Sequence, residues 1–274
     1  FDSRDFEAAQ RHFSAAAEAH PDLSFAYFER ARVRRRLDDD QGALADLERG
    51  LALEPDFVWG LIDRGRLLLS LERPEEALAD FARAAELDPS NFVPHAHAAA
   101  IHYQARRWAE AREAFAAVVR LNPEYTAAYA SLGELSWRLA DYAASARWFA
   151  EAHERRPQEP SYALLAALAF RRQGQAEAAT ELLRRMLAGI ARESWQAVTG
   201  EFLIRPDWDI PLLERIRSER NEIAKKRMLF YLGMQYLMAG RRMAAMTYLL
   251  EAASLERDDL LEKQLAAWEV EHAG

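Results

Sequence analysis

The sequence contains no cysteine, which excludes disulfide bonds, thiol catalysis and cysteine-ligated zinc. Glycine and proline are few, at 11 and 10 of 274 residues, while alanine, leucine, arginine and glutamate are abundant, as a helical protein requires. The longest apolar run, residues 162–170, is too short to span a lipid bilayer. The composition therefore indicates a helical protein without a transmembrane segment.

The N-terminus shows no signal peptide, and the chain begins at Phe1 without a methionine. We therefore expect that preceding residues have been removed, so that a cytoplasmic and a periplasmic location both stay open. Hydrophobic residues make up 50% of the chain, enough to form a sizeable core. The net charge of −8 argues against a nucleic-acid partner, because such proteins bind by neutralising phosphates.

Half of the prolines recur at one constant interval along the chain. They are Pro21, Pro55, Pro89, Pro123 and Pro157. Proline cannot continue a helix and keeps the preceding residue out of the helical conformation. Each of these prolines therefore predicts a helix end, and the constant interval indicates a helical repeat.

Within each 34-residue unit the pattern predicts two helices. In the second helix, small, large and small side chains precede the proline by 12, 8 and 5 residues, as in Ala77, Phe81 and Ala84, so that they share one helical face. The first helix has a small residue at its eighth position, including Gly65 and Gly133. A glycine within a helix costs about 1 kcal/mol relative to alanine, which is acceptable where two helices come close together.

One unit carries a more specific pattern. It consists of Tyr129, Leu132, Gly133, Tyr142, Phe149, Ala152 and Pro157. These residues resemble the tetratricopeptide repeat family almost position by position. The resemblance implies an all-α fold, a right-handed α-solenoid of antiparallel helix pairs that form a superhelix. The sequence contains no phosphate-binding glycine loop and no zinc-protease helix motif, so neither a cofactor nor a bound metal is expected.

The repeat pattern divides the chain into four parts. Residues 1–193 form the predicted array, with half a repeat followed by repeats that start at residues 24, 58, 92, 126 and 160. Residues 194–225, which carry Pro206 and Pro211, interrupt the pattern and predict an irregular helical insert. A further repeat is predicted at 226–259, and residues 260–274 are expected to form a capping helix, because a solenoid must cover its last apolar face.

By the same resemblance, the first helices line a concave groove in which a peptide binds. The expected groove residues are Phe25, Phe28, Arg32, Arg35, Trp59, Ile62, Arg66, Leu69, Tyr103, Glu134, Trp137 and Arg171. Aromatic side chains at these positions suit the apolar anchors of a peptide. Packing of Phe25, Trp59 and Trp137 on neighbouring helices is the alternative.

Charge gives a second indication of the partner. Groove positions nine, twelve and thirteen of the five repeats hold seven arginines and one glutamate. Arginine suits carboxylates, so an acidic peptide is a candidate partner; the alternative is a solvated or internally ion-paired surface. Phe28 and Arg32 stand where chaperone-binding members of the family carry lysine and asparagine, so binding of chaperone tails is not expected.

Other titratable residues have simpler explanations than catalysis. His95 and His102 share a helical face and could bind a metal, but their positions in the repeat predict packing in the core. Asp38, Asp39 and Asp40 predict a cap of the following helix. Asp207 and Asp209 could act in acid–base chemistry, although capping of the helix at Pro211 explains them better.

Four functions are consistent with these features. The first is a non-enzymatic adaptor or scaffold that binds a protein or peptide in its groove. The second is a self-associating structural subunit, since the methionines that cluster between residues 228 and 246 could repack around a second copy. The third is an envelope lipoprotein scaffold that recruits cell-wall enzymes, by a resemblance over few residues. An enzyme that uses the insert at 194–225 is the fourth.

Overall fold

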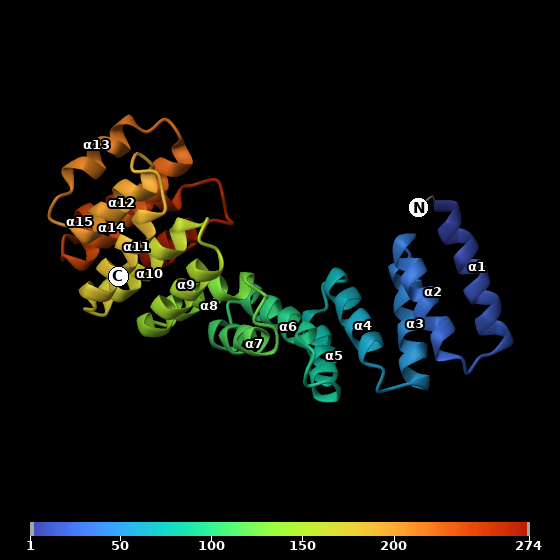
Figure 1. The fold of residues 1–274 in the computed structure, drawn as a ribbon. Helices are drawn as coiled ribbons and strands as arrows, with labels where there is room; N and C mark the ends of the chain where they lie inside the picture. The colour runs from blue at the N-terminus through green and yellow to red at the C-terminus, as the bar shows by residue number, and fades with distance from the viewer. Residues whose placement is uncertain (1–2, 273–274) are drawn as a thin grey trace. The chain divides into compact units, whose positions relative to one another are not determined.

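A computed structural model describes residues 3–272, with side chains from residue 5 onward. Residues 1–2, in the predicted half repeat, and 273–274, at the end of the predicted capping helix, lie outside the described part. All regular secondary structure in the described chain is α-helical (Figure 1). The chain divides into two compact units between residues 122 and 123. The boundary falls inside the array predicted for residues 1–193.

The first unit contains helices α1 to α7. Their bounds are α1 Ser3–Ala19, α2 Ser24–Arg36, α3 Asp40–Leu53, α4 Val58–Ser70, α5 Pro74–Leu87, α6 Phe92–Gln104 and α7 Trp108–Leu121. Consecutive helices pack as the pairs α2 with α3, α4 with α5, and α6 with α7. The hydrophobic core of this unit includes Phe28, Ile62, Leu67 and Phe81.

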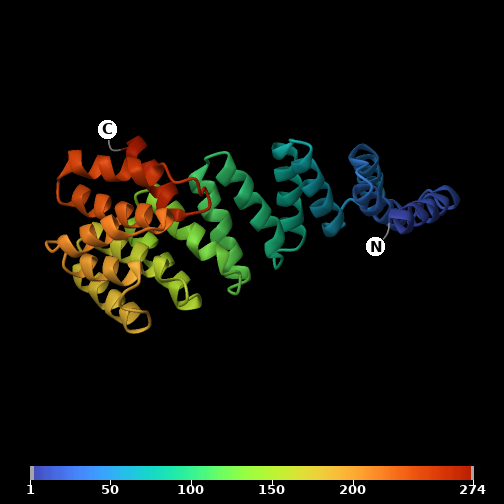
Figure 2. The ribbon, with the colours of Figure 1, turned by 90° about the horizontal axis from the view of Figure 1, so that it is seen from above.

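The second unit contains helices α8 to α16. Their bounds are α8 Ala127–Arg138, α9 Tyr142–Arg155, α10 Pro160–Arg172, α11 Ala176–Ala188, α12 Trp195–Ile204, α13 Ile210–Ser218, α14 Glu222–Met238, α15 Arg242–Ala253 and α16 Leu261–His272. The pairs α8 with α9, α10 with α11, and α14 with α15 repeat the packing of the first unit. The short helix α12 contacts α10, α11 and α14, and α13 contacts α12 and α14. Figure 2 shows the helices of this unit in green to red.

Glycines let paired helices approach closely, as the sequence predicts. A Cβ atom on Gly65 would lie 2.8 Å from the ring of Phe81, and one on Gly133 would lie 2.6 Å from the ring of Phe149. Each phenylalanine comes from the second helix of the same pair and is fully buried. The large residue of one helix therefore fills the space that the missing side chain leaves on the other.

The turns between paired helices share a residue with a positive φ angle, although the residue type at this position varies. Positive φ angles occur at Asp38, Glu72, Arg106, Ala140 and Gly174, which recur at the same interval as the prolines. A left-handed residue commonly ends a helix, and glycine is the usual choice. Only the last of these five positions uses glycine, so composition alone does not reveal this feature.

Two predictions about capping aspartates have different outcomes. Asp39 caps α3, since its carboxylate accepts a hydrogen bond of 2.9 Å from the amide of Gly42. Asp209 precedes α13, but its side chain makes no cap. Instead it accepts a hydrogen bond of 2.5 Å from the hydroxyl of Tyr236. The prediction of a cap at Asp209 was wrong, because a helix distant in sequence supplies a stronger partner.

No helix in the described range is long and apolar enough to cross a lipid bilayer.

Candidate functional site

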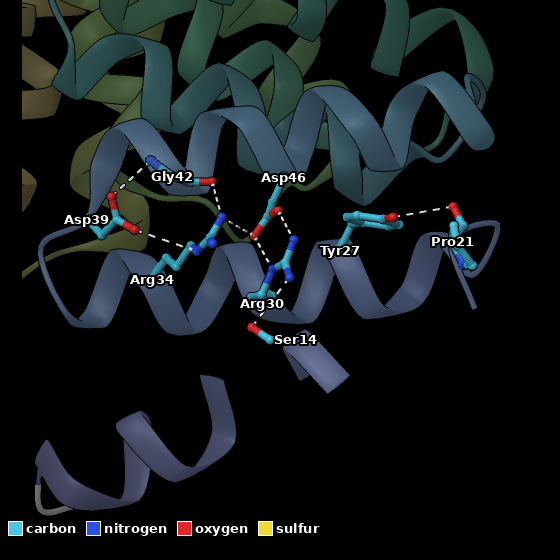
Figure 3. Close-up of polar contacts among 8 residues, drawn as sticks. All are labelled: Ser14, Pro21, Tyr27, Arg30, Arg34, Asp39, Gly42 and Asp46. Atoms are coloured by element: carbon cyan, nitrogen blue, oxygen red, sulfur yellow. Dashed lines mark hydrogen bonds and ion pairs between the residues drawn. The ribbon is translucent and has the colours of Figure 1, made fainter. Parts of the chain in front are cut away.

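The arginines of α2 divide between two faces of the helix. Arg30 and Arg34, one turn apart, point toward α3 and bind Asp46 (Figure 3). The Asp46 carboxylate is buried and accepts hydrogen bonds of 2.6 and 2.8 Å from Arg30 and of 2.8 Å from Arg34. The next helix pair repeats this arrangement with Arg64 and Asp80, again at 2.6 and 2.8 Å. These pairs fix each first helix against its second.

The remaining arginines of α2 line an open cavity of about 400 Å³, here called the arginine pocket. Its wall consists of Ala31, Arg32, Arg35, Arg36, Leu47, Asp63 and Arg66, from α2, α3 and α4. All of these residues, and therefore the whole pocket, belong to the first unit.

Carboxylates neutralise only part of the pocket's charge. Arg32 binds Asp63 at 3.0 Å and Glu29 at 2.6 Å, whereas Arg66 lies 3.8 Å from Asp63. Burial alone would lower the pKa of Arg32, but its bonds to these carboxylates outweigh burial and raise the pKa above its usual value. Within the described residues, Arg35 makes no ion pair. Four arginines thus face two carboxylates, and positive charge remains available for an anion.

Two exposed aromatic side chains extend this surface. Phe25 and Trp59 are 59% and 50% exposed, although large aromatic side chains are usually buried. Each precedes an arginine of the pocket, Arg32 or Arg66, by seven residues. Seven residues make nearly two turns, so each aromatic ring lies on the same helical face, about 10 Å along the axis. The Phe25 ring also makes an edge contact with Phe13 of α1, at 6.4 Å between ring centres. Binding of a peptide by these aromatic and basic residues stays a prediction.

Four of the expected groove residues are buried, and we correct their assignment. Phe28 and Ile62 are core residues of the first unit; Glu134 and Trp137 are buried in the second. The Phe28 ring lies between α3 and α4, where Cβ atoms on Gly50 and Gly60 would come within 2.7 Å of it. Helical position predicts the face of a side chain, but neighbouring helices cover that face here.

The other three expected residues are partly buried and engaged with the fold. Leu69 packs on the first core, and Tyr103 makes an edge contact with Trp108. Arg171 donates hydrogen bonds to the carbonyl of Leu203 at 3.0 Å and to Gln235 at 3.2 Å. Burial lowers the pKa of Arg171. Leu69 and Tyr103 do not contribute to the wall of the arginine pocket.

The histidines of α6 are less buried than the sequence predicts. His95 and His102 are half-buried and line an open cavity of about 640 Å³ between α5, α6 and α7. His97 stacks on Phe81. The prediction of core packing was wrong, because Ala98 and Ala114 occupy the two positions where the preceding repeats carry the arginine–aspartate pair, and their small side chains leave the space open.

The described residues include no group of three or more histidines, aspartates and glutamates that could hold a metal ion.

Comparison with known proteins agrees with the class that the fold defines, an all-α solenoid of helix pairs. Models of the tetratricopeptide repeat match residues 28–92 and 68–135. The structure resembles a crystal structure of MamA, with 18% identity over 60% of this chain and 90% of that chain, and a TM-score of 0.51. No curated protein matches the sequence.

A second similar structure is that of Naa15/Naa10 bound to HypK-THB, with 17% identity, a TM-score of 0.54 and 89% of this chain covered. The chain matches 39% of that longer chain. Together the two repeat models match residues 28–135, and paired helices continue beyond them in the structure.

Proposed function

We propose that this protein is a non-enzymatic adaptor that binds an acidic peptide segment through the arginine pocket and the adjacent Phe25 and Trp59. The observation that carries the proposal is the repeated aromatic–arginine arrangement on α2 and α4, combined with the unpaired guanidinium of Arg35 among the described residues. A guanidinium forms paired hydrogen bonds with a carboxylate, and an exposed ring supplies apolar area for a neighbouring side chain of the peptide.

A peptide array tests this proposal with a defined probe. Its peptides combine one aromatic residue with two to four carboxylates at different spacings, and a matched set replaces each carboxylate by its amide. Labelled protein should bind the acidic set in preference to the amide set. Binding should weaken as salt rises, because exposed charges are screened.

The Arg35→Glu, Arg66→Glu double variant should reduce binding to the best peptide by at least tenfold in fluorescence anisotropy. Neither side chain makes a close ion pair with the described fold, so helicity should not change. Arg156→Glu with Arg217→Glu is the matched control, since both arginines are exposed and lie in the second unit. Equal binding by the wild type and the pocket variant would contradict the proposed site.

Self-association is the second candidate function. Met243, 86% exposed on α15 near the exposed Leu250, favours it, because exposed apolar side chains suit an interface. Light scattering over a range of protein concentrations would detect it.

A further inference from the structure

Helix α16, the last helix of the described chain, lies on the first helices of the helix pairs in the second unit. It contacts α8 and α14 as well as α15, the helix that precedes it. A helix that only covered the end of the solenoid would need contacts with the last pair alone. The contact with α8 brings together residues more than 100 positions apart in sequence.

One face of α16 makes these contacts. Glu262, Leu265, Ala266 and Glu269 are each at most 3% exposed. Their spacing of three, four and seven residues places them in one row along the helix. Two buried carboxylates thus flank a small apolar centre.

The surface beneath α16 provides a specific site for each carboxylate. Glu262 accepts hydrogen bonds of 2.7 Å from Arg227 and 2.8 Å from the hydroxyl of Tyr231. Burial and the charge of Glu262 raise the pKa of Tyr231 well above its usual value, which keeps the hydroxyl protonated as a donor.

At the other end, Glu269 accepts a hydrogen bond of 2.7 Å from the indole of Trp137 and a further one from Arg172. The guanidinium of Arg172 also lies over the rings of Trp137 and Tyr142, at 5.3 and 4.3 Å from their centres. We call the surface formed by Trp137, Arg172, Arg227 and Tyr231 the α16-binding face.

The residues of this face come from α8, α10 and α14, the first helices of their pairs, which were expected to line the groove. In the second unit, α16 occupies the surface that they form. The face recognises two glutamates seven residues apart, about 10 Å on a helix, around a leucine and an alanine.

Helix α16 is attached in a way that permits its release. It spans only 12 residues. The segment before it, residues 256–260, is non-helical, and Glu256, Arg257, Asp258 and Asp259 are exposed. Helices with few buried apolar side chains open at lower free energy than the core of a domain.

We propose that the α16-binding face is a second interaction site, and that it accepts an acidic amphipathic helix of a partner protein with the pattern Glu-x-x-Leu-Ala-x-x-Glu, which displaces α16. The partner helix is expected to be acidic, because both arginines of the face bind carboxylates while α16 is in place. The tethered α16 competes at high effective concentration, so a free helix binds well only when the attachment of α16 is weakened.

The test uses the full chain with Glu262→Gln and Glu269→Gln, which weakens α16 and leaves the binding face intact. The probe is a fluorescein-labelled peptide with the sequence of residues 258–272. The double variant should bind this peptide at least tenfold more tightly than the wild type does. A peptide with glutamine at both positions should bind the variant at least tenfold more weakly than the glutamate peptide.

Two controls make the result decisive. Arg35→Glu with Arg66→Glu should not affect peptide exchange, which separates this site from the arginine pocket. Hydrogen exchange of the wild type should show the amides of α16 exchanging faster than those of α14. If α16 exchanges only with global unfolding, or if the folded double variant does not prefer the glutamate peptide, α16 is a structural cap and the proposal fails. If the protein dimerised with increasing concentration while the α16 amides stayed protected, the occupant of the face would be a second copy of this chain. That result would also overturn the proposal.

Discussion

Asp46 is a buried carboxylate that joins two arginines of the preceding helix. Its side chain is 4% exposed, and those of Arg30 and Arg34 are 14% and 21% exposed. The hydrogen bond to Asp46 raises the pKa of Arg30 above its usual value. Each charge is compensated only while the cluster is complete, since removal of one partner from a buried pair leaves an unpaired charge.

Asp46→Ala should therefore lower the free energy of unfolding by about 3 kcal/mol, as measured by urea denaturation. The control is Asp56→Ala, which removes an exposed carboxylate that binds Arg83 and should change stability little. Similar effects of the two substitutions would show that the buried cluster contributes no more than a surface pair.

The repeated arginine–aspartate pairs also show what sequence reasoning could find at the level of single residues. Arg30 and Arg64 are separated by one repeat, as are Asp46 and Asp80. The period is visible in the sequence, but contact between the members of each pair requires knowledge of how the helices face each other. Exposure is equally non-local: Phe25 and Phe28 lie on one helix, yet only the second is buried.

The sequence pattern predicts the positions at which paired helices contact each other. The constant repeat interval and the small residue at position eight predicted the pairs and the close approach at Gly65. The period could not predict the location of α16, because its contact with α8 depends on side chains outside any repeat. Local sequence patterns therefore predict the helices and their pairing, whereas the α16-binding face depends on contacts that do not repeat.

Gly65→Ala tests the close approach of α4 and α5. Alanine normally stabilises a helix by about 1 kcal/mol relative to glycine. Here the new methyl group would lie 2.8 Å from two atoms of the buried Phe81 ring, so overpacking should reverse the sign and lower the free energy of unfolding by about 1–3 kcal/mol. Gly189→Ala, where the nearest atom is 3.6 Å away, is the control. A gain in stability from Gly65→Ala would refute close packing at this pair.

The whole molecule combines two units that each have a hydrophobic core of their own. The first unit presents an arginine pocket whose charge is only partly neutralised. In the second unit, glutamates of the chain itself bind the arginines of the inner face. Arginines that suit carboxylates thus line an open candidate site in the first unit, and in the second unit such arginines are occupied by the chain's own glutamates.

Stability of the whole chain should fall as the pH decreases from about 7.5 to 5.5. Burial, aided by nearby arginines, lowers the pKa of His95, His97 and His102 in the folded state. The unfolded chain, with pKa values of about 6.5, then binds more protons than the folded chain. The stabilisation is complete above pH 6.5 and is lost as the pH falls through the lower, folded-state values.

Urea denaturation at several pH values would measure this dependence. Replacing His95, His97 and His102 by glutamine should flatten the decrease in the unfolding midpoint between pH 7.5 and 5.5, because glutamine does not titrate. His12→Gln with His20→Gln is the control, since both side chains are exposed on or beside α1. If the triple variant retained the full pH dependence, protonation of other groups would have to cause the loss of stability, and the half-buried histidines would not be the acid-sensitive part of the fold.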